Sequence, residues 1–286
     1  MLKDHNDYAF ARESHYGSVS EPTYGGALSF MRRKYTRELD GVDVAVSGVP
    51  LDLATTNRPG ARFGPAGIRA ASAQIAWARP HGYDFDPLDR LAVIDYGDCL
   101  FDFGRQEQVP ERIKAHAAVH GTLSLLHFDA HSDTWAEEGE RIDHGTMFYH
   151  AAKQDLVDPS RSVQVGLRTY NKDTHGFNIL DARWIHANGP EATVAEIRRI
   201  LGGHKVYLSF DIDCLDPAFA PGTGTPVCGG LSTAQAIAIF RGLAGIEVIG
   251  MDLVEVAPIY DVGQVTALAG ATLAAEYLGL LAHNKT

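Results

Sequence analysis

The chain has 286 residues, enough for one large α/β domain or two small ones, and a hydrophobic content of 45% supports a sizeable core. Its 25 basic and 36 acidic residues give a formal net charge of −11. This charge disfavours nucleic acid or an anionic membrane as a partner and favours a small cationic substrate. Three scattered cysteines (Cys99, Cys214, Cys228) predict free thiols in a reducing compartment. With no apolar signal core and no run of membrane-spanning length, the sequence predicts a cytoplasmic protein.

The first part of the chain is polar and loop-like. We expect residues 1–40 to form an N-terminal extension that supplies subunit contacts, with the basic run at 32–34 on a solvated face or in such a contact. A first strand is predicted at 42–49. The loop at 55–69 is rich in glycine and proline, and Pro65 suits the first turn of a helix. The loop lacks the Gly-Lys-Ser/Thr of a phosphate loop, so we assign it no role in the chemistry.

Apolar runs that predict buried strands then alternate with runs that predict helices. The predicted strands are 91–95, 123–129, 162–166, 206–213 and 247–256, and the predicted helices are 109–120, 191–201, 232–243 and 266–282. Nearly all-apolar strands that alternate with helices are typical of a parallel sheet covered on both faces. We predict a single domain over residues 1–286, with a three-layer α/β/α architecture and a mostly parallel central sheet. Ligands of such sheets bind outside the carboxyl ends of the strands.

Candidate metal ligands follow the strand at 123–129. Asp129, His131 and Asp133 lie at i, i+2 and i+4, so in extended chain their side chains point to one side. Two carboxylates and an imidazole on one side are a metal-ligand arrangement. The alternative is a polar loop in which Asp133 or Thr134 caps the next helix.

A second pair of carboxylates supports the metal interpretation. Asp211 and Asp213 end another apolar run and share a face. Carboxylates in this position repel each other and resist desolvation, and a divalent cation removes both penalties. Four carboxylates and one imidazole, with no thiolate, favour manganese or magnesium over zinc and suit two ions that clamp a shared hydroxide.

These two stretches resemble the metal motifs of the ureohydrolases, the family of arginases and agmatinases. The motifs are Asp-Ala-His-Ser-Asp at 129–133 and Ser-Phe-Asp-Ile-Asp-Cys-Leu-Asp-Pro-Ala-Phe-Ala-Pro-Gly-Thr-Gly-Thr-Pro at 209–226. The resemblance runs from about Tyr24 to the C-terminus and is greatest to agmatinases. It implies an arginase-like fold, two Mn²⁺ ions per chain, and cleavage of a guanidino group to urea and an amine. With agmatine the amine would be putrescine, a step of polyamine biosynthesis. It also implies a homotrimer or homohexamer.

The resemblance assigns roles to three further side chains. His144, in an Asp-His-Gly setting, would deliver a proton to the leaving amine; the alternative is a structural histidine that caps the helix around Phe148. Glu255 would bind the substrate guanidinium; the alternative is a salt bridge to Arg168. Asp133 would orient the hydroxide or accept its proton, in addition to binding metal.

The substrate is the least determined part of this prediction. Arginases place small polar residues after the first motif, whereas residues 135–140 are Trp-Ala-Glu-Glu-Gly-Glu. An acidic wall suits agmatine, which has a second cation and no carboxylate. Guanidinobutyrate and arginine remain alternatives. Among neighbouring residues, we expect His127 to pack against or support the site and Asp252 to be a core or ladder residue. We expect Cys214 to be a small buried residue that points away from the site, and Asp98 to have a loop or helix-cap role.

One family motif is missing. Ureohydrolases carry a Gly-Gly-Asp-His segment upstream of the first motif, and its histidine binds one metal. Here there is no room for it, and about one βα unit of roughly thirty residues is lacking, with the join expected at 113–121. If the chain is continuous, we expect the sheet to be one strand short beside the strand that ends at Asp129, with an exposed edge. A non-catalytic ureohydrolase-like protein is the corresponding alternative function.

Overall fold

The structure, a computed structural model, describes residues 7–18, 21–53, 55–77, 79–102, 105, 122–136 and 142–285. The predicted helix at 109–120, the expected join at 113–121 and the glutamates at 137–140 lie outside the described residues.

The strands form two parallel sheets. The larger has the order β6-β5-β4-β7-β8 and the smaller has the order β1-β3-β2. The strands are β1 (Lys34–Tyr35), β2 (Val44–Gly48), β3 (Val93–Asp98), β4 (Ser124–Phe128), β5 (Val163–Val165), β6 (Asn178–Leu180), β7 (Val206–Asp211) and β8 (Val248–Val254). Every strand pair in the described part of the chain is parallel, as the apolar runs predicted.

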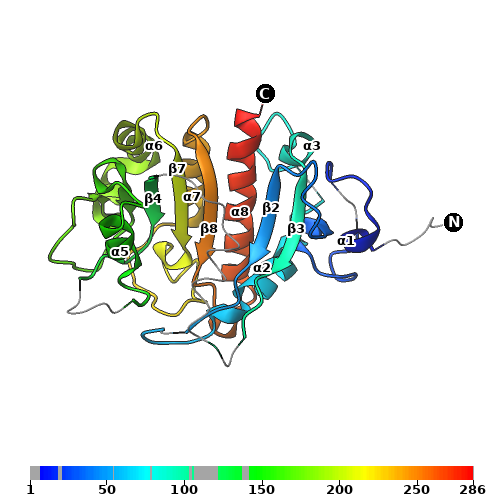
Figure 1. The fold of residues 1–286 in the computed structure, drawn as a ribbon, viewed down its shortest axis with the longest axis horizontal. Coiled ribbons are helices and arrows are strands. Elements are labelled where there is room, and N and C mark those ends of the chain that lie inside the picture. Colours follow the sequence, from blue (N-terminus) through cyan, green and yellow to red (C-terminus); the bar gives the residue numbers. More distant parts are fainter. Residues whose placement is uncertain are drawn as a thin grey trace.

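Helices cover both faces of the larger sheet. On one face α6 (Ala182–Leu201), α7 (Thr233–Gly242), α8 (Val265–Asn284) and α2 (Gly64–Ser72) form a row in which each helix contacts the next. Phe128 of β4 and Phe210 of β7 pack there against Phe240 of α7. On the opposite face Leu125 of β4 packs with Phe148 of α5 (Met147–Lys153), because successive side chains of a strand alternate between faces. This arrangement confirms the predicted three-layer α/β/α fold (Figure 1).

Among the residues that the structure describes, no strand joins β2 to β8. Each is the edge strand of its own sheet, and α8 is visible between them in Figure 1. All five residues of β4 are buried, whereas most residues of β2 and β8 are only half-buried. The described strands are therefore one short of a continuous sheet, as expected, but the predicted position of the gap is wrong. The strand that ends at Asp129 has neighbours on both sides, β5 and β7.

Helix α8 corrects the expectation about membrane-spanning segments. Its 20 residues have a mean hydropathy high enough to cross a membrane by length and composition. Its apolar residues instead contact α2, α3 (Pro87–Arg90), α7 and β8, and 67% of the most apolar window is buried. α8 is a core helix whose composition reflects burial between the two sheets.

Three local features differ from the predictions. α6 begins at Ala182, nine residues before the predicted start, because Asp181 caps it and the chain continues through a kink at Gly189. β1 and β6 are two and three residues long, too short to give a recognisable apolar run. Arg32 and Arg33 are buried rather than solvated: Arg32 donates to the carbonyl oxygens of Ala27 and Gly25. Burial lowers the pKa of Arg33 to about 9.

Candidate metal centre and active site

The ring of His131 lies between two carboxylates from different strands. Its Nδ1 is 3.2 Å from Oδ1 of Asp129, just past β4, and 3.1 Å from Oδ2 of Asp213, in the turn that follows β7. Both aspartates are almost fully buried. Burial alone would lower the pKa of His131, but the two hydrogen bonds raise it to about 10. The two carboxylates thus favour a positive charge at this position, which a divalent cation would also supply.

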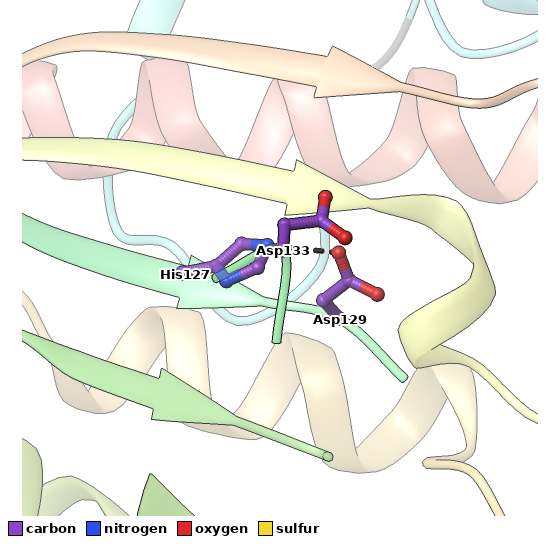
Figure 2. Close-up of side chains that lie close together, drawn as sticks. All are labelled: His127, Asp129 and Asp133. Atoms are coloured by element: carbon purple, nitrogen blue, oxygen red, sulfur yellow. Dashed lines mark hydrogen bonds and ion pairs between the residues drawn. The ribbon is translucent and has the colours of Figure 1, made fainter. Parts of the chain in front are cut away.

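Asp129 also belongs to a second cluster, with His127 and Asp133. The side chains of the three residues lie close together at the carboxyl end of β4 (Figure 2), and their potential ligand atoms lie within 4.8 Å of one another. Burial and the charge of Asp129 raise the pKa of Asp133. Asp133 has a φ of 51°, in the left-handed region that is costly for a residue with a side chain. The next described helix, α5, begins only at Met147, so the helix-cap alternative for Asp133 is wrong.

Asp211, the fifth predicted ligand, lies beside these clusters. Its Oδ1 accepts a hydrogen bond of 2.8 Å from the backbone N–H of Asp213. Burial, followed by the charges of Asp213, Asp129 and Glu255, raises its pKa. Thus four of the five predicted ligands belong to the two clusters around Asp129 and the fifth adjoins them, as expected for the carboxyl ends of adjacent parallel strands.

His144 and Glu255 contact each other directly. Nδ1 of His144 is 2.9 Å from Oε1 of Glu255, and its Nε2 is 2.9 Å from the carbonyl oxygen of Leu53. The two side chains therefore lie together on one side of the site rather than flanking it from different sides. The hydrogen bond to Glu255 raises the pKa of His144 to about 9. Glu255 has a φ of 62°, a second left-handed position among the predicted site residues.

The structural alternatives for these two side chains are not realised in the described part of the chain. α5 has Thr146 at its N-cap, so His144 does not cap it. Arg168 donates to backbone carbonyl oxygens, among them those of Asp213 and Val227, and forms no ion pair with Glu255.

The loop after β2 closes over the site, a role that the sequence did not indicate. Leu53 contributes the carbonyl oxygen to His144, and Arg58 donates to the carbonyl oxygens of Thr223 and Gly224 in the second motif. Gly224 in turn lies so near Glu255 that an added Cβ would come within 3.3 Å of its Oε2. Backbone carbonyl groups are common to all residues, so no sequence signal could have identified Leu53.

The remaining expectations concern supporting residues. Asp252 is a half-buried residue of β8 that accepts hydrogen bonds from the hydroxyl groups of Tyr207 and Ser209. Cys214 is fully buried, as predicted, and burial raises the pKa of its thiol. Asp98 is neither a loop nor a cap residue: it ends β3 and pairs with Arg69 at 2.7 Å.

Comparison with known proteins identifies the fold and the family. Residues 42–120 and 111–279 match the model of the arginase family. The chain belongs to the arginase family. It is an agmatinase-like ureohydrolase, 50% identical to an agmatinase of Chromobacterium violaceum over 98% of this chain and 97% of that protein. An agmatinase of Neisseria meningitidis is 47% identical over 83% of this chain and 87% of its own length.

Solved structures of arginase-family proteins share the fold. A hypothetical agmatinase from Burkholderia thailandensis is 53% identical, with a TM-score of 0.94 and coverage of 98% of each chain. The proclavaminate amidino hydrolase of Streptomyces clavuligerus is 33% identical, with a TM-score of 0.86 and coverage of 92% of this chain and 99% of its own.

The comparisons also bear on the missing unit. The alignment with the Chromobacterium violaceum relative spans 311 residues, more than the 286 of this chain, so that relative contains residues that this chain lacks. The two family matches overlap at 111–120, which means that these residues align with two different parts of the family pattern. Both observations indicate a deletion joined within 111–120, in agreement with the position expected from the sequence.

Proposed function

We propose that this arginase-family chain hydrolyses agmatine to urea and putrescine, as a manganese-dependent cytoplasmic enzyme of polyamine biosynthesis. The observation that carries the proposal is the position of the Glu255–His144 pair near a group of four aspartates and a histidine, three of them buried aspartates, at the carboxyl ends of β4, β7 and β8. The agmatinase relatives support the choice of substrate.

The donor set fits a hard divalent cation. Asp129, Asp133, Asp211, Asp213 and His131 offer carboxylate oxygens and one imidazole, which suit Mn²⁺. Burial and mutual repulsion raise the pKa values of Asp129, Asp133 and Asp211, a penalty that a bound cation would remove. These five residues would hold the metal, which when bound supplies a water of lowered pKa as the nucleophile.

Glu255 is suited to bind the guanidinium. A planar guanidinium pairs with a carboxylate through two parallel N–H···O bonds. One oxygen of Glu255 faces His144, so substrate must share this carboxylate with the imidazole or displace it. Because Glu255 lies just past the end of β8, it would orient the guanidinium carbon toward the aspartate cluster.

His144 is suited to donate a proton to the leaving amine. Both of its ring nitrogens face acceptors, the Glu255 carboxylate and the Leu53 carbonyl oxygen, as expected of a doubly protonated imidazolium. With a pKa raised to about 9, the ring carries its proton at neutral pH. Asp133 would accept the proton of the attacking water.

Urea release separates this proposal from its alternatives. Purified protein with Mn²⁺ should release urea from agmatine at a higher kcat/KM than from arginine or guanidinobutyrate. A preference for either of those would make the substrate assignment wrong. Bound Mn²⁺ without urea from any of the three would favour the non-catalytic alternative.

The assembly is a further part of the proposal. We infer a homotrimer or homohexamer in which residues 1–40 supply subunit contacts. In support, Tyr24 and Leu28 are 94% and 50% exposed, so their apolar side chains are available for such contacts. A stable monomer in light scattering would contradict this inference.

A further inference from the structure

The two clusters that share Asp129 contain one histidine each, but the histidines have different surroundings. His131 is half-buried and faces Asp129 and Asp213. His127 is 1% exposed and lies between Asp129 and Gln164, with Phe148 packed against its ring at 4.5 Å between centroids. Whether His127 can bind a metal depends on which ring nitrogen carries its hydrogen, because a ligating nitrogen needs a free lone pair.

The side-chain amide of Gln164 determines which ring nitrogen of His127 carries the hydrogen. Its Nε2 donates to the carbonyl oxygen of Ser132 at 2.5 Å and lies 3.1 Å from Nδ1 of His127. The opposite amide orientation would place Oε1 against the Ser132 oxygen, two acceptors in contact. An amide nitrogen accepts no hydrogen bond, so Nδ1 of His127 must accept and carries no hydrogen.

The hydrogen of the neutral ring is therefore on Nε2. Nε2 is 2.8 Å from Oδ2 of Asp129 and donates to it. This bond leaves Oδ1 of Asp129 facing His131, whose backbone N–H also donates to it at 2.6 Å. Asp129 is thus fixed from one side by His127 and presents its other oxygen to the first cluster.

We propose that His127 is a positioning residue for Asp129 and not a metal ligand, and that the two metal positions beside Asp129 are consequently unequal. The position of Asp129, His131 and Asp213 has an imidazole ligand. The position of Asp129 and Asp133, with Asp211 adjoining, has carboxylates alone within the described residues. From the ligands that the described residues offer, we expect one divalent cation to bind more tightly than a second. This inference rests on the proposed function in that it takes the site to bind metal; the hydrogen bonds of His127 do not depend on that proposal.

The tautomer can be measured without metal or substrate. Metal-free protein with ¹⁵N-labelled histidine should show His127 with hydrogen on Nε2 in two-bond ¹H–¹⁵N correlation spectra, with the signal assigned from a His127→Gln variant. Hydrogen on Nδ1 would overturn the inference, whatever the protein's activity.

Calorimetric titration of wild-type protein and two variants with Mn²⁺ tests the role of His127. Wild type should show a tight and a weak step. His127→Leu removes the donor to Asp129 and should weaken the tight step about 10- to 100-fold. His127→Gln keeps an N–H donor and should largely restore the tight step, with circular dichroism confirming that both variants fold. If both variants instead lose only the weak step, His127 is a ligand and the inference is wrong.

The same titrations separate this inference from the proposed function. If two Mn²⁺ ions bind with unequal affinity and His127 carries its hydrogen on Nε2, but no guanidino compound yields urea, only the proposed function is overturned. Urea release with two equally tight Mn²⁺ ions would overturn only the inference.

Discussion

The ring of His144 and the carboxylate of Glu255 form a contact of 2.9 Å between residues that are 111 positions apart in the chain. The contact links the loop before α5 to the end of β8, and the Leu53 carbonyl oxygen extends it to the loop after β2. The proton donor and the guanidinium-binding carboxylate of the proposed reaction are thus one hydrogen-bonded unit. Changes to either residue should alter the other.

Glu255→Gln should reduce kcat/KM for agmatine by about 30-fold, since losing one charge of this part-buried, hydrogen-bonded pair costs about 2 kcal/mol. Mn²⁺ affinity should change little, because Glu255 belongs to neither histidine–aspartate cluster. The pKa of His144, measured by NMR, should fall. Glu247→Gln, at an exposed glutamate just before β8, is the matched control. It should leave kcat/KM, Mn²⁺ affinity and the pKa of His144 unchanged. Unchanged activity of the Glu255 variant would exclude it from substrate binding.

Asp213→Asn should remove tight Mn²⁺ binding and urea release together. Asp213 supplies one of the two carboxylates that hold His131, and its loss leaves Asp129 as the remaining partner in the first cluster. The pKa of His131 should fall from about 10 toward its ordinary value. Asp173→Asn, at an exposed carboxylate, serves as the control. Tight metal binding by the Asp213 variant, measured by calorimetry, would contradict the assignment of this ligand.

The metal-free protein should become less stable as pH rises above about 6.5. His131 and His144 have pKa values raised to about 10 and about 9 in the folded state, so above 6.5 they keep protons that the unfolded chain has lost. The stabilisation that these two protonated histidines contribute is complete below the histidine pKa of the unfolded chain, about 6.5. It is lost as pH rises through the folded-state pKa of His144, about 9, and then through that of His131, about 10. The raised pKa values of Asp129, Asp133 and Asp211 act in the same direction.

Thermal unfolding from pH 6.5 to 10 measures this dependence. Excess Mn²⁺ should reduce or reverse the trend, because a cation replaces the proton held between His131, Asp129 and Asp213. A metal-free protein whose Tm rises over this range would show that the buried cluster is not protonated as described.

Restoring the missing unit should join the two sheets. The residues that the Chromobacterium violaceum relative carries in addition can be inserted within 111–120, where the two family matches overlap. A strand between β2 and β8 would pair both free edges, and we expect Tm to rise by more than about 3 °C. The second Mn²⁺ should also bind more tightly, since the family's additional histidine belongs to this unit. A glycine–serine insert of equal length is the control, and an equal effect of both inserts would contradict the prediction.

The sequence by itself determined the layers, most strands and the family. Apolar runs such as 123–129 and 206–213 can be buried only as strands covered on both faces, and the spacing of Asp129, His131 and Asp133 places three potential ligands together from local geometry alone. Pro65 and Ser232 likewise mark helix starts that the structure contains, in α2 and α7. These features depend on neighbours within a few residues, which the sequence displays directly.

Only the tertiary structure decided how distant segments meet. The contact of His144 with Glu255 and Leu53, the hydrogen bonds that fix His127 through Gln164, and the burial of Arg32 and Arg33 all involve partners that no local pattern specifies. The position of the sheet interruption is the clearest case. Residues missing before β4 in the chain leave their gap between β2 and β8, because in a parallel sheet strand order follows the crossovers and not the sequence.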